Sequence, residues 1–157
     1  MHDEHIGRLL LRAHRVYGER ALAKLHARGH RDLGMAHVTL LPYIDPDEGT
    51  RTSTLGERAG ISKQAAGQIV SDLETAGYVR RAGEEGDARA SRVLFTKKGR
   101  QLFDDALAVK HDIDGELAAV IGAKGLENLR KLLVQFLEAE PPPSPPAPAP
   151  ARRGRRA

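Results

Sequence analysis

The chain has 157 residues, a formal net charge of +4 and no cysteine. Its length allows one domain with its own hydrophobic core and a short additional segment. The lack of cysteine excludes disulfides, thiolate catalysis and cysteine-ligated zinc, and it favours a reducing cytoplasmic location.

The charge is unevenly distributed along the chain. Residues 51–100 carry 10 basic and 6 acidic residues, whereas residues 101–140 carry 4 basic and 8 acidic ones. A basic segment beside an acidic one indicates a localised anion-binding surface, as in proteins that bind nucleic acids. The alternative is an ordinary surface on which the charges are scattered.

The N-terminal part predicts a long helix over residues about 4–28, because its apolar residues recur at helical spacing. Arg8, Arg12 and Arg15 interrupt its short apolar run, so neither a signal peptide nor a membrane span is predicted. Glycines 29 and 34 end this helix, and "AHVTLLPYI" predicts a shorter one. The turn "DPDEG" then precedes a short helix over roughly 52–59.

The stretch "GISKQAAGQIVSDLETAGYVRR" predicts the next helix, with Ser62 as N-cap and Gly77 just beyond its C-terminus. At about 100° per residue its two faces separate. One face is apolar and is expected to point inward, and consists of Ala65, Ala66, Ile69, Val70 and Leu73. The other face carries no acid and consists of Lys63, Gln64, Gly67, Gln68 and Ser71.

A lysine and two amides suit contact with phosphates and base edges in a major groove. Gly67 in mid-helix costs roughly 1 kcal/mol relative to alanine. A backbone that lies close to DNA would account for that cost. An ordinary solvated helix face that tolerates a glycine is the alternative.

Two short strands, "YVRRA" and "SRVLF", predict a hairpin with the glycine-rich tip "GEEGDA". Thr96 is the expected N-cap of a long helix, and "GAKG" separates that helix from a last one. Residues 141–157, "PPPSPPAPAPARRGRRA", predict a disordered tail that joins no core. Its arginines either attract phosphates without sequence preference or are simply solvated.

A short helix, a tight turn, a polar-faced helix and a basic hairpin form a winged helix-turn-helix pattern. The segments "LGERAGISKQAAGQIVSDLETAGYVRR" and "GDARASRVLFTKKGR" resemble the MarR (multiple antibiotic resistance regulator) family of bacterial transcription factors. The resemblance implies a mainly α fold with a small two-stranded β-wing. It places a family domain at residues 1–140, with the winged helix-turn-helix at about 33–96 and dimerisation helices at about 4–28 and 97–139.

The resemblance also implies partners and site residues. A homodimer is expected to read a pseudo-palindrome in double-stranded DNA in the cytoplasm, on the nucleoid, as a repressor. The positions that match the recognition helix and would face the major groove are Ser62, Lys63, Gln64 and Gln68, with Gly67 and Ser71 on the same face. In the wing, Asp87 and Arg89 match an aspartate–x–arginine pattern whose arginine borders the minor groove. Arg92 is a further candidate for phosphate contact.

This sequence departs from the family pattern at three positions. Glu85 stands where the wing usually has proline, and Ala88 stands where it usually has a basic residue. Glu84 and Glu85 add negative charge near the tip, so weaker or differently angled wing contact is expected. Gly67 replaces a position often held by serine or threonine, which removes side-chain readout there.

Many relatives release DNA when a phenolic or aromatic acid binds between the dimerisation helices and the winged module. His14, Arg15 and Tyr17 are the candidates to face such an effector; otherwise they are surface or dimer-contact residues.

No cofactor is expected, and the sequence has no motif of hydrolases, phosphate-binding loops or zinc proteases, so an enzyme is not expected.

Two alternative regulators stay open from the sequence. His26 and His30 have i, i+4 spacing with His37 downstream, but Gly29 interrupts the helix and no cysteine or evident carboxylate completes a metal site. A metal-responsive regulator is therefore one alternative. A ligand-independent architectural DNA-binding protein is the other.

Overall fold

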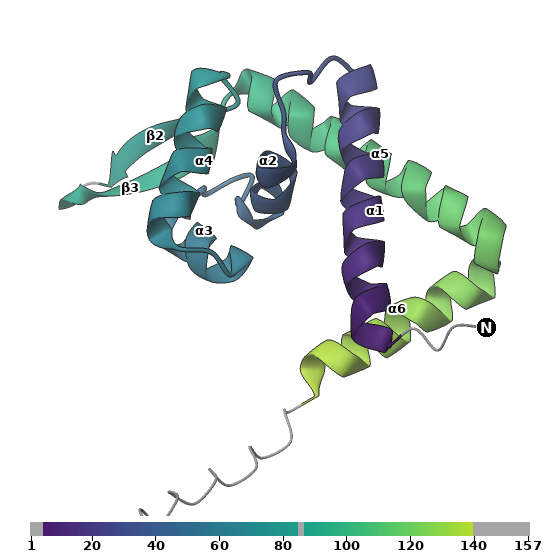
Figure 1. Ribbon diagram of the computed structural model, residues 1–157. Helices are drawn as coiled ribbons and strands as arrows, with labels where there is room; N and C mark the ends of the chain where they lie inside the picture. Colours follow the sequence, from purple (N-terminus) through teal and green to yellow (C-terminus); the bar gives the residue numbers. More distant parts are fainter. Residues whose placement is uncertain (1–4, 85–86, 140–157) are drawn as a thin grey trace, which may run out of the picture.

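The computed structural model describes residues 5–84 and 87–139, with the side chains of residues 84–90 excepted (Figure 1). The predicted disordered tail, 141–157, lies outside the described residues. The elements follow in the order α1 (Ile6–Ala27), α2 (Met35–Leu40), η1 (Leu41–Tyr43), β1 (Thr50–Arg51), α3 (Thr52–Ala59), α4 (Lys63–Thr75), β2 (Val79–Glu84), β3 (Asp87–Phe95), α5 (Lys97–Ile121) and α6 (Ala123–Glu138).

The predicted helix boundaries are confirmed by their caps. The Ser62 hydroxyl accepts a hydrogen bond of 3.1 Å from the backbone N–H of Ala65 at the start of α4. The Thr96 hydroxyl accepts one of 3.1 Å from the N–H of Gly99 at the start of α5. Gly77, at φ +79°, takes the left-handed conformation that ends a helix at low cost.

The predicted two-stranded wing is confirmed as the antiparallel pair β2 and β3, and an unpredicted third strand, β1, extends it to a sheet with the order β1–β3–β2. The third strand, Thr50–Arg51, pairs with Val93 and Arg92 of β3. A strand of two residues has no measurable alternation of apolar and polar residues, and its pairing depends on β3, about 40 residues away. The pairing ties the start of α3 to the base of the wing.

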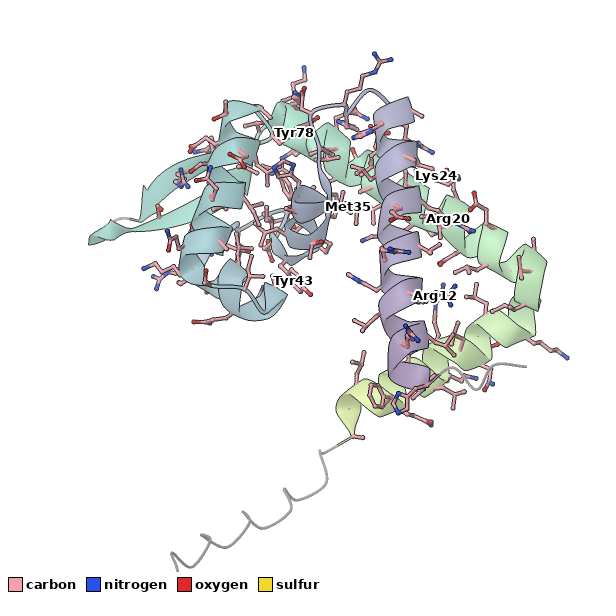
Figure 2. The ribbon with its side chains drawn as sticks, in the orientation of Figure 1. Arg12, Arg20, Lys24, Met35, Tyr43 and Tyr78 are labelled. Atoms are coloured by element: carbon pink, nitrogen blue, oxygen red, sulfur yellow. The ribbon has the colours of Figure 1, made fainter. Side chains whose placement is uncertain are left out.

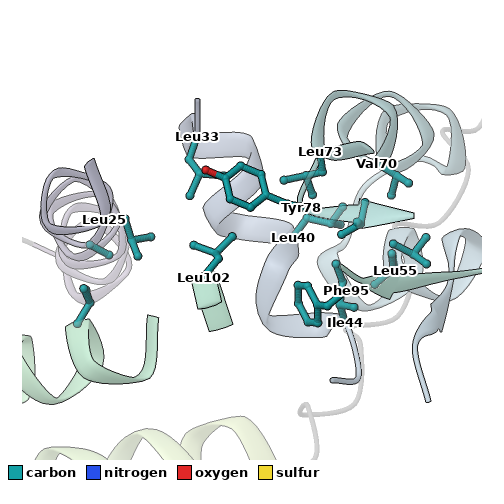
Figure 3. Close-up of a cluster of buried hydrophobic side chains, with 14 of the residues drawn as sticks. Leu25, Leu33, Leu40, Ile44, Leu55, Val70, Leu73, Tyr78, Phe95 and Leu102 are labelled. Carbon is teal, nitrogen blue, oxygen red and sulfur yellow. The ribbon is translucent and has the colours of Figure 1, made fainter. Parts of the chain in front are cut away.

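The hydrophobic core centres on Tyr78, which is fully buried between α4 and β2. Figure 3 shows its ring among the side chains of Leu33, Leu40 and Leu73. The same cluster continues to the contact between α1 and α5, where Leu25 and Val109 are buried. The winged module and the long helices therefore share one core.

Helix α6 differs from the other long helices because none of its residues, all within the described part of the chain, is buried. It turns back from α5 at Gly122, whose φ is +78°, and runs past the N-terminal end of α1 (Figure 1). The ion pair between Arg130 and Asp114, at 2.6 Å, links it to α5. Among the described helices, none is long and apolar enough to cross a membrane.

Gly99 and Gly115 of α5 provide a matched test of this packing. A Cβ on Gly99 would overlap the Tyr78 carbonyl and lie 2.8 Å from a Phe95 ring carbon, whereas the space beside Gly115 is open. Gly99→Ala should therefore lower the free energy of unfolding by about 2 kcal/mol. Gly115→Ala should raise it by up to about 1 kcal/mol through helix propensity.

Both effects are measured by urea unfolding at one fixed protein concentration. A Gly99→Ala protein as stable as the Gly115→Ala protein would contradict the close packing of α5 on Tyr78.

Candidate nucleic-acid interface and ligand cavity

The outer face of α4 presents the polar residues that the sequence singled out. Ser62, Lys63, Gln64 and Gln68 are exposed, and they lie along the first two turns of the helix. Within the described part of the chain, the side chains of Lys63 and Gln64 form no hydrogen bond or ion pair. Their polar groups are therefore available to an external partner.

The inner face of α4 agrees with the prediction except at Ala65. Ala66, Val70 and Leu73 are buried and Ile69 is half-buried, but Ala65 is exposed. The reason is the position of Ala65 in the first turn, where its neighbour Ala66 faces α3. Ala65 lies about 100° further round the helix, outside that contact.

Two of the predicted DNA-facing side chains are engaged within α4. The side-chain amide of Gln68 donates to the Asp72 carboxylate at 2.9 Å. The Ser71 hydroxyl donates to the Gly67 carbonyl at 3.0 Å. Gln68 keeps its amide oxygen as an acceptor, whereas the half-buried Ser71 is held by the helix backbone. The arrangement therefore presents Lys63, Gln64 and Gln68 to a partner more directly than Ser71.

No internal contact requires the glycine at position 67. Apart from the neighbouring residues and the backbone of α4 itself, no described atom lies within 4 Å of the position that a Cβ on Gly67 would occupy. The missing side chain leaves the middle of the outer face of α4 low, and the half-buried Gly67 backbone there accepts hydrogen bonds from Ser71 and Arg81 through its carbonyl. This geometry suits a close approach of the helix backbone to a broad ligand surface such as a DNA groove.

Strand β3 carries the predicted wing residues Asp87, Arg89 and Arg92. The side chains of Asp87 and Arg89 lie outside the described residues. Arg92 is half-buried, and its guanidinium donates to the carbonyls of Gly49 at 3.1 Å and Glu48 at 3.3 Å. Arg92 thus braces the loop before β1, a role within the fold that the sequence does not predict.

Hydrogen bonds within that loop also hold its conformation. The Asp45 carboxylate accepts hydrogen bonds from the backbone N–H groups of Glu48 at 2.8 Å and Asp47 at 2.9 Å. These bonds, the one from Glu48 first, hold the pKa of Asp45 below its usual value. The loop and the Arg92 guanidinium together fix the base of the wing against α3.

A cavity of about 280 Å³ lies between α1, the α2–η1 segment and α5. It lies between the winged module and the long helices, which is where the family resemblance predicted an effector site. His14 and Tyr17 line it, and Figure 2 shows Met35 and Tyr43 on the side of the winged module that faces α1. Arg15 is not among the lining residues, because it lies about 100° round α1 from His14. It pairs instead with Glu19 at 3.7 Å.

The cavity combines apolar walls with a few polar groups. Met35, Phe103 and Leu107 supply apolar surface, while Lys110 brings an ammonium group that the sequence reasoning missed. Burial, and then the charge of Asp114, raise the pKa of Tyr17, so its phenol stays a neutral hydrogen-bond donor. Such a lining suits a small ligand that combines an apolar body with a polar group.

A larger hollow of about 710 Å³ lies between α1, α5 and α6. Its walls are almost entirely apolar and include Leu9, Ile113 and Leu129. Beside it, Phe136 and Leu137 of α6 are 65% and 78% exposed. Apolar surface that is continuous over three helices marks an interaction surface.

A buried polar network joins the winged module to the long helices. His30, in the loop between α1 and α2, lies 2.9 Å from the Asp105 carboxylate of α5 and 3.3 Å from the Tyr78 hydroxyl. The bond from His30 is the main cause that lowers the pKa of Asp105, against the effect of burial. Burial likewise raises the pKa of Tyr78.

The three histidines considered for a metal site have other partners. His26 bonds to the Leu33 carbonyl at 2.8 Å, and His37 accepts from the N–H of Gly34 at 2.8 Å. His30 belongs to the network with Asp105 and Tyr78. Within residues 5–84 and 87–139, no group of three metal-ligating side chains lies together.

Comparisons with known proteins agree with the winged helix-turn-helix architecture. Residues 31–90 match the model of the MarR family. The chain is 27% identical over 86 residues to the HTH-type transcriptional regulator TtmR of Methylorubrum extorquens. The aligned region covers 55% of this chain and 44% of that protein. The chain thus spans less than half the length of this relative.

A second curated relative is matched over nearly its whole length. The HTH-type transcriptional repressor Rv2887 of Mycobacterium tuberculosis is 26% identical over 131 residues, 83% of this chain and 92% of that protein. Its crystal structure in complex with salicylic acid superposes with a TM-score of 0.66, at 25% identity over 86% of this chain and 98% of that one. A MarR transcriptional regulator from Methanosarcina mazei shares the fold with a TM-score of 0.74, at 22% identity over 85% and 94% of the chains.

The network at Asp105 predicts a pH-dependent stability. Because the folded-state pKa of Asp105 is lowered, its contribution is fully present above the unfolded pKa of about 3.9 and is lost as the pH falls through the folded-state value. Asp105→Asn should therefore lower the free energy of unfolding by about 1–3 kcal/mol at pH 7. The difference from the wild type should shrink below about pH 4.

Urea unfolding between pH 7 and pH 3 measures this difference, and Asp104→Asn, at the exposed neighbouring carboxylate, is the control. Equal losses for both variants, or a difference that does not change with pH, would refute the role of the network.

The open space at Gly67 predicts opposite effects on stability and on DNA affinity. Gly67→Ala should stabilise the folded chain by up to about 1 kcal/mol, since alanine favours the helix and meets no other atom. The same methyl group should weaken binding to DNA if the backbone of α4 lies against the groove. Thermal unfolding and titration of a fluorescent duplex measure the two effects. Unchanged DNA affinity would identify position 67 as part of an ordinary solvated face.

Proposed function

We propose that the chain, whose residues 31–90 match the model of the MarR family, is a dimeric repressor released from a pseudo-palindromic operator by a small aromatic acid. The observation that carries the proposal is the outer face of α4, where exposed Lys63, Gln64 and Gln68 surround the open position of Gly67. The relatives are transcriptional regulators, which agrees with the expectation that the chain is not an enzyme.

The proposed DNA contacts follow from the chemistry of each side chain. Lys63 neutralises a phosphate, and the amides of Gln64 and Gln68 hydrogen-bond base edges in the major groove, adenine above all. Ser62 lies at the N-terminus of α4, where backbone N–H groups attract phosphate oxygens. Arg89 enters the minor groove, where the narrow walls concentrate negative potential, and Asp87 orients it.

The apolar hollow between α1, α5 and α6 supports a homodimer. A second copy that inserts its own terminal helices would cover Leu129, Phe136 and Leu137, whose burial contributes roughly 1.5–3 kcal/mol per side chain. Two copies related by a two-fold axis present two α4 helices to two half-sites. The operator is therefore a pseudo-palindrome with half-sites about one helical turn apart.

The cavity beside His14 and Tyr17 is the proposed effector site. Salicylic acid is the ligand named for the complex of the Mycobacterium tuberculosis relative. In this chain, the carboxylate of such a ligand pairs with Lys110 and its ring packs against Met35 and Phe103. Because the cavity walls come from both the winged module and the long helices, a ligand that fits one arrangement better shifts the spacing of the two α4 helices.

We place this repressor in the bacterial cytoplasm, on the nucleoid.

Selection from a random duplex pool by the full-length chain tests the proposed function. The expected result is enrichment of one inverted repeat, bound with an affinity that falls steeply as salt rises. No enrichment over several rounds, or enrichment of a sequence without two-fold symmetry, would contradict a dimeric sequence-specific regulator. An architectural protein would give the first of these results.

Lys63→Ala should weaken binding to the selected duplex and reduce the slope of log affinity against log salt by about one, because one phosphate contact is lost. Lys124→Ala, which removes the same charge from exposed α6, is the matched control. Fluorescence anisotropy at a series of salt concentrations gives both slopes. Equal slopes for both variants and the wild type would remove Lys63 from the interface.

Salicylate should release the selected duplex, and salicylamide, which lacks the carboxylate, should do so much less. Lys110→Ala should raise the salicylate concentration needed for release about tenfold, the equivalent of about 1.4 kcal/mol, and leave DNA affinity without ligand unchanged. Competition titrations with both compounds measure the effect. Release by salicylamide at the same concentration would show that Lys110 does not pair with the ligand.

A further inference from the structure

One arginine of the wing is bound to the recognition helix by several hydrogen bonds. The Arg81 guanidinium of β2 donates to the Glu74 carboxylate at 2.6 Å, to the Ser71 hydroxyl at 3.0 Å and to the Gly67 carbonyl at 3.3 Å. The backbone N–H of Arg81 donates to the second Glu74 oxygen at 3.1 Å. We name these four residues the Arg81 clamp.

The clamp spans the outer half of α4. Gly67, Ser71 and Glu74 are separated by four and three residues, so they lie along one stripe of the helix. This stripe lies within the outer face that also carries Lys63, Gln64 and Gln68, and it continues toward the C-terminal end of α4. A single guanidinium therefore connects the wing to the middle of the helix that we propose enters the major groove.

An arginine is suited to this connection because its planar group offers donors in a fixed fork. One edge binds the Glu74 carboxylate while the other reaches two oxygens of α4. A lysine has one ammonium group and cannot hold all three acceptors at these distances. The Arg81 side chain is 33% exposed and that of Glu74 is 38% exposed, and ion pairs with this exposure contribute little to stability.

The wing amplifies small changes in its orientation. Strand β2 has six residues, and at about 3.3 Å per residue it extends about 20 Å from its base. A rotation of about 10° at the base would therefore displace the tip by roughly 3 Å, as far as the length of a hydrogen bond. The angle between β2 and α4 decides whether the tip and the helix can reach their grooves together.

We propose that Arg81 is a positioning residue for DNA binding, which fixes the angle between α4 and the wing and does not itself contact a phosphate. The clamp engages three guanidinium hydrogen bonds within the protein, one of them to the Glu74 carboxylate. The inference rests on the proposed DNA-binding function, and it adds a residue that touches neither base nor backbone of the DNA.

In the opposite hypothesis, Arg81 itself contacts a DNA phosphate, and its ion pair with Glu74 occupies it only until DNA binds. The two hypotheses predict opposite signs for Glu74→Gln. If Arg81 positions the wing, loss of the carboxylate loosens the clamp and weakens binding to the selected duplex about five- to tenfold, with an unchanged salt slope. If Arg81 contacts phosphate, the same change frees a cation, removes a repulsive charge and strengthens binding.

Arg81→Lys adds a test that keeps the charge. The positioning role predicts weaker binding to the selected duplex, whereas Arg80→Lys, at the exposed neighbour that points to the other side of β2, has no such effect. In an Arg89→Ala background, Arg81→Lys should reduce DNA affinity less than it does in the wild type. Without Arg89 the wing makes no minor-groove contact, so its correct placement no longer improves binding. Purely additive losses would overturn the positioning role.

Anisotropy titrations with the selected duplex and a scrambled duplex, at several salt concentrations, measure all variants. Unfolding curves identify any variant that binds poorly because it is unfolded. If the wild type selects no sequence, the proposed function itself fails. If the wild type selects one and Glu74→Gln binds it equally well or more tightly, only the positioning role of Arg81 is overturned.

Discussion

The packing around Tyr78 holds the two halves of the molecule together. Its buried ring belongs to the core of the winged module, and its carbonyl accepts hydrogen bonds from the N–H and hydroxyl of Thr96, at 3.0 and 3.2 Å, where α5 begins. Gly99 has no side chain and so allows α5 to approach this carbonyl. The Tyr78 hydroxyl meets His30, and the Lys98 ammonium lies 4.2 Å from the ring centre. The turn from α4 into β2 and the direction of α5 therefore meet at Tyr78.

A second constraint comes from the surface that one chain leaves uncovered. Helix α6 has no buried residue in the described chain, and the hollow that it forms with α1 and α5 is apolar. In the proposed dimer, a second copy would cover this hollow, stabilise the long helices and determine the distance between the two α4 helices. The proposed effector cavity lies between these long helices and the winged module. Occupancy of that cavity and spacing of the DNA-reading helices would thus be mechanically linked in the proposed dimer.

Local signals in the sequence predict the helices and their ends well. Ser62, Gly77 and Thr96 act through contacts within a few residues, so their roles can be read without the fold. Strand β1 escapes prediction because two residues carry no periodicity. Ala65 is wrongly predicted to lie in the core. The position of a residue around the helix axis does not show how far along α4 the packing against α3 extends.

The candidate site can be predicted only in part. The outer face of α4 follows from helical spacing alone, but Arg81 is defined by Glu74, Ser71 and Gly67, which only the packing of β2 on α4 brings to it. Lys110 reaches the proposed effector cavity from α5, about 90 residues from His14 and Tyr17. Arg15 is a neighbour of His14 in sequence, but its position round α1 places it outside that cavity.

The mass of the complex between the full-length chain and the selected duplex tests the central claim, a two-fold symmetric reader of DNA, most directly. Sedimentation equilibrium at several concentrations gives this mass without a label. A two-fold symmetric reader predicts two chains per duplex, with binding lost cooperatively when one half-site is scrambled. A complex of one chain per duplex, or a mass that increases with duplex length whatever the sequence, would contradict it.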